Sequence, residues 1–311
     1  METTKYIWLN GKMVNWEDAK INVITHALHY GSAAFEGIRA YKTDKGPGIF
    51  RLEEHIDRLF YSADALAMKL PYTKQELMDA TCQVVAQNNI ESCYIRPIVF
   101  YGYGAMGVSV ANAPIDVCIA CWPWGAYMPH EMVDVKIVNH RRLSPHAFKA
   151  DAKIAGHYIN SIMASLELKG THYHEGILLD EQGYIAEGPG ENVFFVKNEK
   201  LITPKLGNIL AGITRRTVIT LANDMGIEVE EKQILPNEAY EADEAFYSGT
   251  AVEICPIHSI DDHIIGNGKF DGISKTIKEA YNEAITMKNP KHQDWVTLCS
   301  DSKASKSESA I

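Results

Sequence analysis

The sequence predicts an α/β (α+β) protein of two domains, and three observations support this prediction. The chain has 311 residues, which is long for a single domain. Short β-branched and aromatic runs alternate with longer stretches of helical apolar spacing. A stretch rich in Pro, Gly and aromatic residues divides the chain. We therefore expect a small N-terminal α+β domain over 1–122, a linker over 123–132, a larger C-terminal domain over 133–289 and a mobile tail over 290–311.

The first half should open with a hairpin, because Asn10-Gly11 separates strand-like runs at 6–9 and 12–14. A strand over 35–41 comes next, followed by two helices. The first has apolar residues at helical spacing between 52 and 66, and the second begins at a Thr73/Glu76 capping box and runs to about residue 87. Strands at 94–101 and 115–122 complete the predicted N-terminal domain.

The second half alternates strands with helices. The expected strands cover 135–139, 176–180, 193–197, 228–234 and the region 244–257, and the expected helices cover 158–169, 214–225 and 274–286. Beyond Pro290 the apolar periodicity stops, and 300–309 is rich in Ser, Lys and Asp. This composition predicts a mobile tail.

The composition excludes several classes of partner. The formal net charge is -10, and nucleic-acid binding requires basic patches, so we expect no nucleic-acid partner. No apolar run is long enough to span a bilayer and the first residues lack a targeting pattern, which predicts a cytoplasmic protein without a membrane partner. Six scattered cysteines predict reduced thiols rather than a disulfide framework or a metal site.

Lys153 is the first candidate for chemistry. It lies among small residues in the segment 151–158, just before an expected helix. A lysine amine in such a position can form a Schiff base with an aldehyde, and pyridoxal phosphate is a cofactor that supplies one. The alternative is a solvated lysine on a loop.

Glu187 is the second candidate. A strand ends at this residue and passes into the turn Gly188-Pro189-Gly190, which can present the carboxylate inward. A carboxylate facing the ring nitrogen of a pyridoxal cofactor keeps that nitrogen protonated. The alternative is a plain hairpin with a solvated glutamate.

Two further segments are candidates for binding an anion. In 210–216 a loop leads into a helix near Thr214, and the first N–H groups of a helix lack internal partners and attract anions. Thr214 could instead be an ordinary N-cap. The turn 248–251, Ser-Gly-Thr-Ala, also offers N–H groups that could hold a carboxylate or a phosphate.

Taken in this order, the four segments resemble the fold type IV pyridoxal-phosphate enzymes. The N-terminal half narrows the resemblance to branched-chain amino acid aminotransferases, since it carries His-Tyr-Gly at 29–31, Phe-Glu-Gly-Ile-Arg at 35–39, Tyr-Ile-Arg-Pro at 94–97 and Trp-Gly-Ala-Tyr at 124–127. The similarity runs from about residue 6 to about residue 287 and is far more specific than one short motif. It implies a two-domain fold with a pseudo-barrel C-terminal domain, and pyridoxal 5′-phosphate as cofactor.

The resemblance also implies a role for each site residue. Lys153 is the Schiff-base lysine and proton shuttle, Glu187 is the partner of the pyridine nitrogen and Tyr158 contacts the phenolic oxygen. The implied phosphate ligands are Arg58, Ile213, Thr214 and Thr250. The implied ligands of the substrate α-carboxylate are Tyr94, Thr250 and Ala251. Arg96 and Tyr30 receive the side-chain carboxylate of glutamate, and the aliphatic side chain is surrounded by Tyr30, Phe35, Val108, Trp124, Tyr127 and Tyr158.

The function implied by the resemblance is a reversible ping-pong transfer of an amino group between L-leucine, L-isoleucine or L-valine and 2-oxoglutarate. The partners are thus small amino acids and 2-oxo acids. A homodimer, or a higher homo-oligomer built from dimers, is implied as well, with Tyr30 and Val108 supplied by the neighbouring chain. The alternatives are a D-amino acid aminotransferase or an aminodeoxychorismate lyase of the same fold, and a cofactor carrier without catalytic activity.

Overall fold

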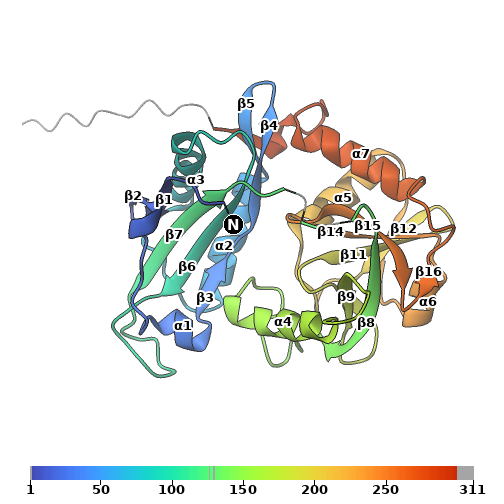
Figure 1. The fold of residues 1–311 in the computed structure, drawn as a ribbon, viewed down its shortest axis with the longest axis horizontal. Coiled ribbons are helices and arrows are strands. Elements are labelled where there is room, and N and C mark those ends of the chain that lie inside the picture. The colour runs from blue at the N-terminus through green and yellow to red at the C-terminus, as the bar shows by residue number, and fades with distance from the viewer. Residues whose placement is uncertain (1, 126, 129, 300–311) are drawn as a thin grey trace, which may run out of the picture.

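Two β-sheets organise the chain in the computed structural model, which describes residues 2–299 except 126 and 129 (Figure 1). The first sheet has the order β17-β5-β4-β6-β7-β1-β2, with β3 paired to β6. Its strands are β1 (Tyr6–Leu9), β2 (Lys12–Asn15), β3 (Ala33–Phe35), β4 (Ile38–Thr43), β5 (Gly46–Phe50), β6 (Cys93–Tyr101), β7 (Ile115–Trp122) and β17 (Val296–Leu298). The helices of this half are α1 (His26–Tyr30), α2 (Leu52–Asp64) and α3 (Lys74–Gln87).

The second sheet has the order β10-β9-β8-β15-β14-β11-β12-β13, with β16 paired to β15. Its strands are β8 (Val133–Arg141), β9 (Glu175–Leu179), β10 (Ile185–Glu187), β11 (Asn192–Lys197), β12 (Lys200–Pro204), β13 (Val229–Lys232), β14 (Glu244–Gly249), β15 (Glu253–Ile260) and β16 (His263–Ile264). Its helices are α4 (Tyr158–Glu167), α5 (Ile213–Asp224), α6 (Pro236–Tyr240) and α7 (Ile273–Ile285). Parallel pairs, such as β8 with β9, occur beside antiparallel ones, which confirms the mixed α/β class.

Local sequence signals produced several of these elements as predicted. Asn10 and Gly11 both have positive φ, +48° and +88°, which is the type I′ geometry of a two-residue hairpin. Thr73 accepts a hydrogen bond from the Glu76 N–H, and the Glu76 side chain accepts one from the Thr73 N–H, so the predicted capping box is confirmed. Such a cap contributes about 1 kcal/mol to helix stability.

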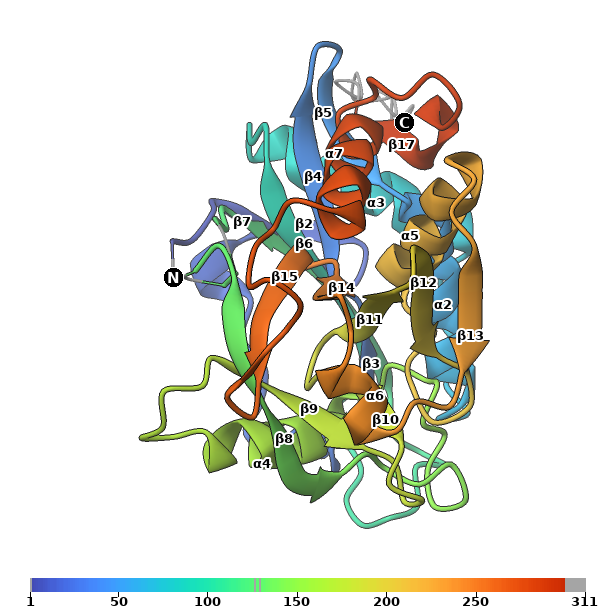
Figure 2. The same cartoon turned by 90° about the vertical axis from the view of Figure 1, so that its right-hand side faces the viewer.

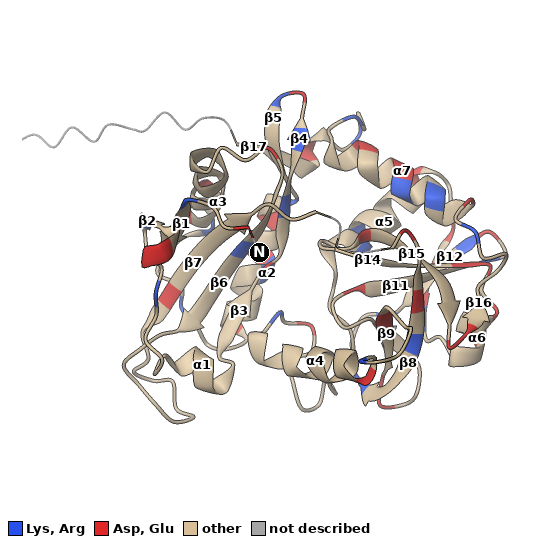
Figure 3. Cartoon of the chain, in the orientation of Figure 1, with Lys and Arg blue, Asp and Glu red and all other residues tan. Residues whose placement is uncertain are grey.

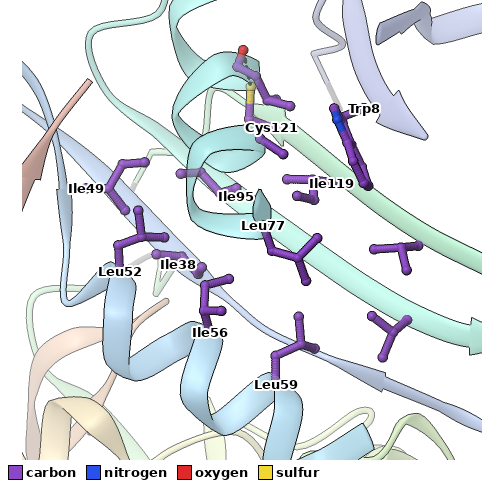
Figure 4. Packing of buried hydrophobic residues seen from close by; sticks show 14 of the residues in the cluster. Trp8, Ile38, Ile49, Leu52, Ile56, Leu59, Leu77, Ile95, Ile119 and Cys121 are labelled. Atoms are coloured by element: carbon purple, nitrogen blue, oxygen red, sulfur yellow. Dashed lines mark hydrogen bonds between the residues drawn. The ribbon is translucent and has the colours of Figure 1, made fainter. Parts of the chain in front are cut away.

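The N-terminal core lies between α2, α3 and the first sheet. Figure 4 shows Ile56 and Leu59 of α2 facing Ile38 and Ile95 of the strands, with Leu77 of α3 beside them. All five side chains are buried. Because apolar residues three and four apart share one face of a helix, α2 buries one side and leaves its other side free for polar contacts.

The predicted strand over 35–41 is interrupted at Glu36 and Gly37, which separate β3 from β4, but both parts pair with β6 in the same register. The Glu36 carboxylate is buried and contacts His55 and Arg58 of α2, while the Glu36 N–H still donates to Pro97 O of β6 at 2.9 Å. Gly37 lies where a Cβ would be 2.0 Å from Tyr94 Oη. Any larger residue would displace Tyr94, so the glycine permits a close approach that the strand pattern does not reveal.

In the second half, α4 lies at one end and α5 and α7 lie at the other, near the β4–β5 hairpin (Figures 1 and 2). Phe50 of β5 packs against Tyr281 of α7, with ring centroids 5.7 Å apart. The two halves therefore share part of a hydrophobic core. The exact domain limits at 122 and 133 stay predictions.

The expected tail from residue 290 is wrong for 293–298, which form a short helical turn and β17. Val296 pairs with Phe50 in the first sheet, and Trp295 is buried against the same ring. The C-terminal segment thus returns across the molecule to the edge of β5, a long-range pairing that local composition does not encode. The remainder of the predicted tail, 300–311, lies outside the described residues.

Candidate active site

One cavity lies between the two sheets, and most of the predicted site residues line it. Tyr30 and Val108 are outside it, but the other predicted residues line it: Phe35, Arg58, Tyr94, Arg96, Trp124, Tyr127, Lys153, Tyr158, Glu187, Ile213, Thr214, Thr250 and Ala251. Residues far apart in the sequence therefore share one space. Ala126 of the linker motif is outside the described residues.

Lys153 is anchored through its backbone to the first half of the molecule. Its N–H donates to Ser62 Oγ at 2.9 Å, and its carbonyl accepts a bond from the Phe35 N–H at 3.1 Å. The side chain enters the cavity, where Nζ lies 2.6 Å from Tyr158 Oη and 5.0 Å from the centre of the Phe35 ring. These backbone contacts fix the main chain of Lys153 at the junction of the two halves, and they do not depend on the lysine side chain.

Glu187 presents its carboxylate inward from a register shift in β10. One oxygen accepts a bond from Arg142 Nε at 2.5 Å, and the other accepts bonds from Asn192 Nδ2 and the Leu210 N–H, both at 3.1 Å. Burial raises the pKa of Glu187, and the Arg142 charge opposes that rise. The alternative of a solvated hairpin glutamate is thus wrong for this residue.

Two of these partners of Glu187, Asn192 and Arg142, were not predicted as site residues from the sequence. Asn192 belongs to the same turn motif, so its spacing from Glu187 could have drawn attention to it. Arg142 follows β8 and is 45 residues from Glu187, and no local pattern distinguishes it from the neighbouring Arg141.

The start of α5 leaves backbone N–H groups that could bind an anion. The N-cap is Gly212, which makes no side-chain cap, so the alternative of Thr214 as N-cap is wrong. The first intrahelical bond is donated by Arg216 to Gly212 O, which leaves the preceding N–H groups of the helix, Ile213 and Thr214 among them, without helical partners. A Cβ on Gly212 would lie 2.0 Å from Asn192 Oδ1, so glycine is required for this approach.

Arg58 brings a positive charge to this helix start. Its Nη1 donates to Ala211 O at 3.1 Å, while Nε and Nη2 bond to the buried Glu36 at 2.6 and 2.9 Å. Burial alone would raise the pKa of Glu36, but Arg58 and His55 outweigh it and hold that pKa below its usual range. The guanidinium is thereby fixed beside the unpaired N–H groups, an arrangement suited to a phosphate.

We expect Arg58→Met to lower the free energy of unfolding by about 3–5 kcal/mol, because it leaves the Glu36 charge buried with one partner fewer. It should also weaken cofactor binding. Chemical denaturation and a cofactor titration would measure both effects. Arg216→Met on α5 is the control, since Arg216 is exposed and 3.9 Å from Glu54, a surface pair worth about 1 kcal/mol or less. Equal losses in the two variants would contradict the assignment.

Aromatic rings form the opposite wall. Trp124 packs edge-to-face on Tyr94 with centroids 4.5 Å apart and on Tyr127 at 5.6 Å. Arg96 places its guanidinium 4.7 Å from the centre of the Phe35 ring and donates to Tyr94 Oη at 3.2 Å. Its buried Nε has no hydrogen-bond partner in the described part of the chain. This wall can hold an aliphatic group, and Arg96 can bind a carboxylate at its edge.

Tyr30 and Val108 are surface residues in a single chain. Tyr30 is 44% exposed and its hydroxyl accepts a bond from the Gly107 N–H, and Val108 is 91% exposed. Contribution of these residues to a neighbouring cavity stays a prediction.

Lys and Arg residues are dispersed along both halves of the molecule (Figure 3). Over residues 2–299 apart from 126 and 129, no group of three or more His, Cys, Asp or Glu side chains could hold a metal ion. Within the same residues, no helix combines the length and apolar character that a membrane span requires.

Comparisons with known proteins agree with the fold and the cavity. Residues 33–260 match the family model described as amino-transferase class IV. A protein of Pseudomonas aeruginosa named branched-chain-amino-acid aminotransferase is 43% identical over 94% of this chain and 96% of its own length. The protein of that name from Escherichia coli K12 is also 43% identical, over 94% of this chain and 98% of its own.

A solved structure extends the comparison to three dimensions. The T.th. branched-chain amino acid aminotransferase complexed with N-(5′-phosphopyridoxyl)-L-glutamate matches with a TM-score of 0.93 and 41% identity, covering 96% of this chain and 100% of that one. The fold type IV class inferred from the sequence is confirmed by this match. The chain belongs to the class IV aminotransferases and, within them, to the branched-chain-amino-acid aminotransferase family.

Proposed function

We propose that the chain transfers an amino group reversibly between L-leucine, L-isoleucine or L-valine and 2-oxoglutarate, with pyridoxal 5′-phosphate as cofactor. One observation carries the proposal: the Lys153 amine, the buried Glu187 carboxylate and the Arg96 guanidinium share one cavity with an aromatic wall. Relatives 43% identical bear the corresponding name. We also propose that the enzyme acts in the cytoplasm.

The cavity fits the cofactor in three places. Pyridoxal phosphate supplies an aldehyde for covalent capture of amines and a ring that accepts electrons from the substrate α-carbon. Glu187 would hold the proton on the ring nitrogen, and Tyr158 would bond the phenolic oxygen. The phosphate would be bound by Arg58, by the free N–H groups of Ile213 and Thr214, and by the hydroxyls of Thr214 and Thr250. Among the described residues, the buried Ser248 Oγ beside this turn has no hydrogen-bond partner, which supports a polar ligand there.

Lys153 would then carry the proton transfers. Its Nζ would serve as the general base that takes the proton from the substrate α-carbon and as the acid that later returns it. Tyr158 Oη, which accepts a hydrogen bond from Nζ at 2.6 Å, would orient the amine for this role. The cofactor would carry the amino group between the two half-reactions, with water supplying the oxygen of the released keto acid, which is the basis of the proposed ping-pong order.

The aromatic wall of the cavity must accept an aliphatic side chain in one half-reaction and a carboxylate in the other. Tyr94 with the Thr250–Ala251 turn would bind the α-carboxylate in both. Phe35, Trp124 and Tyr127 would cover the branched side chain, and Arg96 would receive the distal carboxylate of 2-oxoglutarate.

Arg96→Met should therefore raise the KM for 2-oxoglutarate by roughly ten- to a hundredfold, because a charged hydrogen bond is worth about 1.5–3 kcal/mol. The KM for 4-methyl-2-oxopentanoate should change by less than about threefold, since that substrate has no distal charge. Steady-state kinetics with both keto acids would measure the difference. Arg141→Met, at an exposed position at the end of β8, is the control. Parallel rises for both keto acids would show that Arg96 shapes the wall without recognising the carboxylate.

Assay of L-isoleucine against D-alanine, each with 2-oxoglutarate, tests the function as a whole. We expect turnover of L-isoleucine to dominate. Strong D-alanine turnover would favour a D-amino acid aminotransferase, and turnover of aminodeoxychorismate would favour the lyase. An absorption spectrum that does not respond to L-leucine would indicate a carrier without catalytic activity.

We further propose that two chains associate around α4 and α1, so that Tyr30 and Val108 reach the partner's cavity. Supporting this, α4 exposes Ile159, Ile162 and Leu166, which are each more than half exposed in the single chain. Apolar residues grouped in this way on one helix usually mark an interface. A solution mass of 34.7 kDa, that of one chain, would contradict the proposal.

A further inference from the structure

Two buried acids beside the cavity have no part in the proposed reaction. Glu191 lies in the turn between β10 and β11 and lines the cavity, and Glu175 begins β9. They are only 5% and 7% exposed. Each accepts a bond from a neighbouring peptide N–H: Gly190 bonds to Glu191 Oε2 at 3.0 Å and Gly176 bonds to Glu175 Oε1 at 2.9 Å. In the described part of the chain, neither acid forms an ion pair.

This environment differs from that of the other buried acids of the site. Glu36 has Arg58 and His55, and Glu187 has Arg142. An ionised carboxylate buried without a cation costs several kcal/mol, and such a group takes up a proton instead. Burial and the nearby Glu175 raise the pKa of Glu191 well above its usual range, and burial raises the pKa of Glu175 to about 7.

The groups around Glu191 reinforce the neutral form. The titratable groups that face it or its partner acid are Glu175 of β9, Glu187 of β10, Tyr247 of β14, Cys255 of β15, Tyr127 of the linker, and Lys153. Lys153 is the cation among them and favours ionisation of Glu191, whereas both glutamates oppose it. The Tyr247 hydroxyl already donates to Gly176 O at 2.7 Å, so it is not free to donate to the acids.

We propose that Glu191 is a specificity-determining residue whose carboxyl must be neutral for the cavity to bind a dicarboxylic substrate. The two substrate classes share an α-carboxylate, but 2-oxoglutarate brings a second negative charge into the space bounded by Tyr127 and Arg96. An ionised Glu191 would repel that second charge, while a branched aliphatic side chain would be indifferent to it. This inference rests on the proposed function, and it explains how the same cavity binds both aliphatic and dicarboxylic substrates.

Equilibrium binding measurements can compare how the charge of Glu191 affects a dicarboxylic ligand and an aliphatic one. Glutarate and 4-methylpentanoate differ by one distal carboxylate, and neither can be transaminated. We would titrate each into the cofactor-loaded enzyme by calorimetry from about pH 6.5 to about pH 9.5, where both ligands stay ionised because carboxyl groups titrate near pH 4. The ratio of the glutarate Kd to the 4-methylpentanoate Kd should rise roughly tenfold across this range, the equivalent of one pKa unit. At the alkaline end, glutarate binding should also take up a proton, which calorimetry in buffers of different ionisation enthalpy detects.

Three variants make the test specific. Glu191→Gln should keep the ratio seen at low pH, abolish its rise and abolish proton uptake. Glu175→Gln should move the rise to lower pH, because it removes a like charge that hinders ionisation of Glu191. Glu181→Gln, at an exposed position outside the cavity, should behave as the wild type.

Each outcome decides the proposal. A flat wild-type ratio, a rise that persists in Glu191→Gln, or failure of both ligands to bind would overturn it. A pH-dependent ratio in an enzyme that does not transaminate L-leucine would refute the proposed function and leave the role of Glu191 in binding standing. Transamination of L-leucine together with a Kd ratio that does not change with pH would support the proposed function and refute the role of Glu191.

Discussion

Lys153→Ala is expected to lower kcat for L-leucine by roughly 10⁴-fold, the largest effect of any single substitution in this chain. The variant removes the only group proposed to carry a proton between the substrate α-carbon and the cofactor. Tyr158 Oη lies 2.6 Å from the lost amine, but in the proposal it bonds the cofactor's phenolic oxygen and does not replace the base. Single-turnover kinetics with L-leucine would measure the loss.

The fold should tolerate this change. The main chain at Lys153 is held by Ser62 and Phe35 through backbone groups, which alanine retains. Lys149→Ala, at an exposed lysine four residues earlier, is the matched control and should keep the wild-type rate. Borohydride reduction followed by peptide mapping should locate the cofactor label on Lys153 in the wild type. A label on another side chain would remove the basis of the proposed mechanism.

Glu187→Gln should lower kcat by roughly 10²–10³-fold, the range found when a buried electrostatic stabiliser of a transition state is removed. Glutamine has nearly the same shape but no charge, so it cannot hold a proton on the ring nitrogen. The cofactor should still bind through its phosphate and Lys153. The rate of the half-reaction, together with the absorption spectrum of the bound cofactor, would report the change.

A loss of stability could imitate this loss of rate, because Glu187→Gln leaves the Arg142 guanidinium buried without its carboxylate. Removing one partner of a buried pair costs about 3–5 kcal/mol. The double variant Glu187→Gln/Arg142→Met removes both charges and should recover much of that stability. If it also recovered the rate, the role of Glu187 in catalysis would be wrong.

Local signals account for the parts of the fold that were predicted correctly. The Asn10-Gly11 turn needs positive φ at both residues, and the Thr73/Glu76 box lies within four residues, so each is determined by its own stretch of chain. The candidates Lys153 and Glu187 were found in the same way, from small residues before a helix and from a glycine-containing turn. The family resemblance then supplied roles that no single segment carries.

The errors arose where distant segments meet. The role of Glu36 was not recognised, because its partners His55 and Arg58 are 19 and 22 residues away. Val296 joins the first sheet because the edge of β5 is free to pair, although its local composition indicates a tail. Arg142 and Asn192 were not recognised because their importance lies in the buried carboxylate that they stabilise.

Short-range patterns were enough to predict the class of fold and most of the elements, and to mark Lys153 and Glu187 as candidates, since these depend on periodicity, turn geometry and motifs within short stretches. Which charges are paired could be learned only from the folded chain. Glu36, Glu187 and Glu191 are all glutamates next to glycine, yet the first two pair with arginines from other elements and the third forms no ion pair in the described chain. The state of a buried acid depends on the groups that surround it in space, and packing alone brings those groups together.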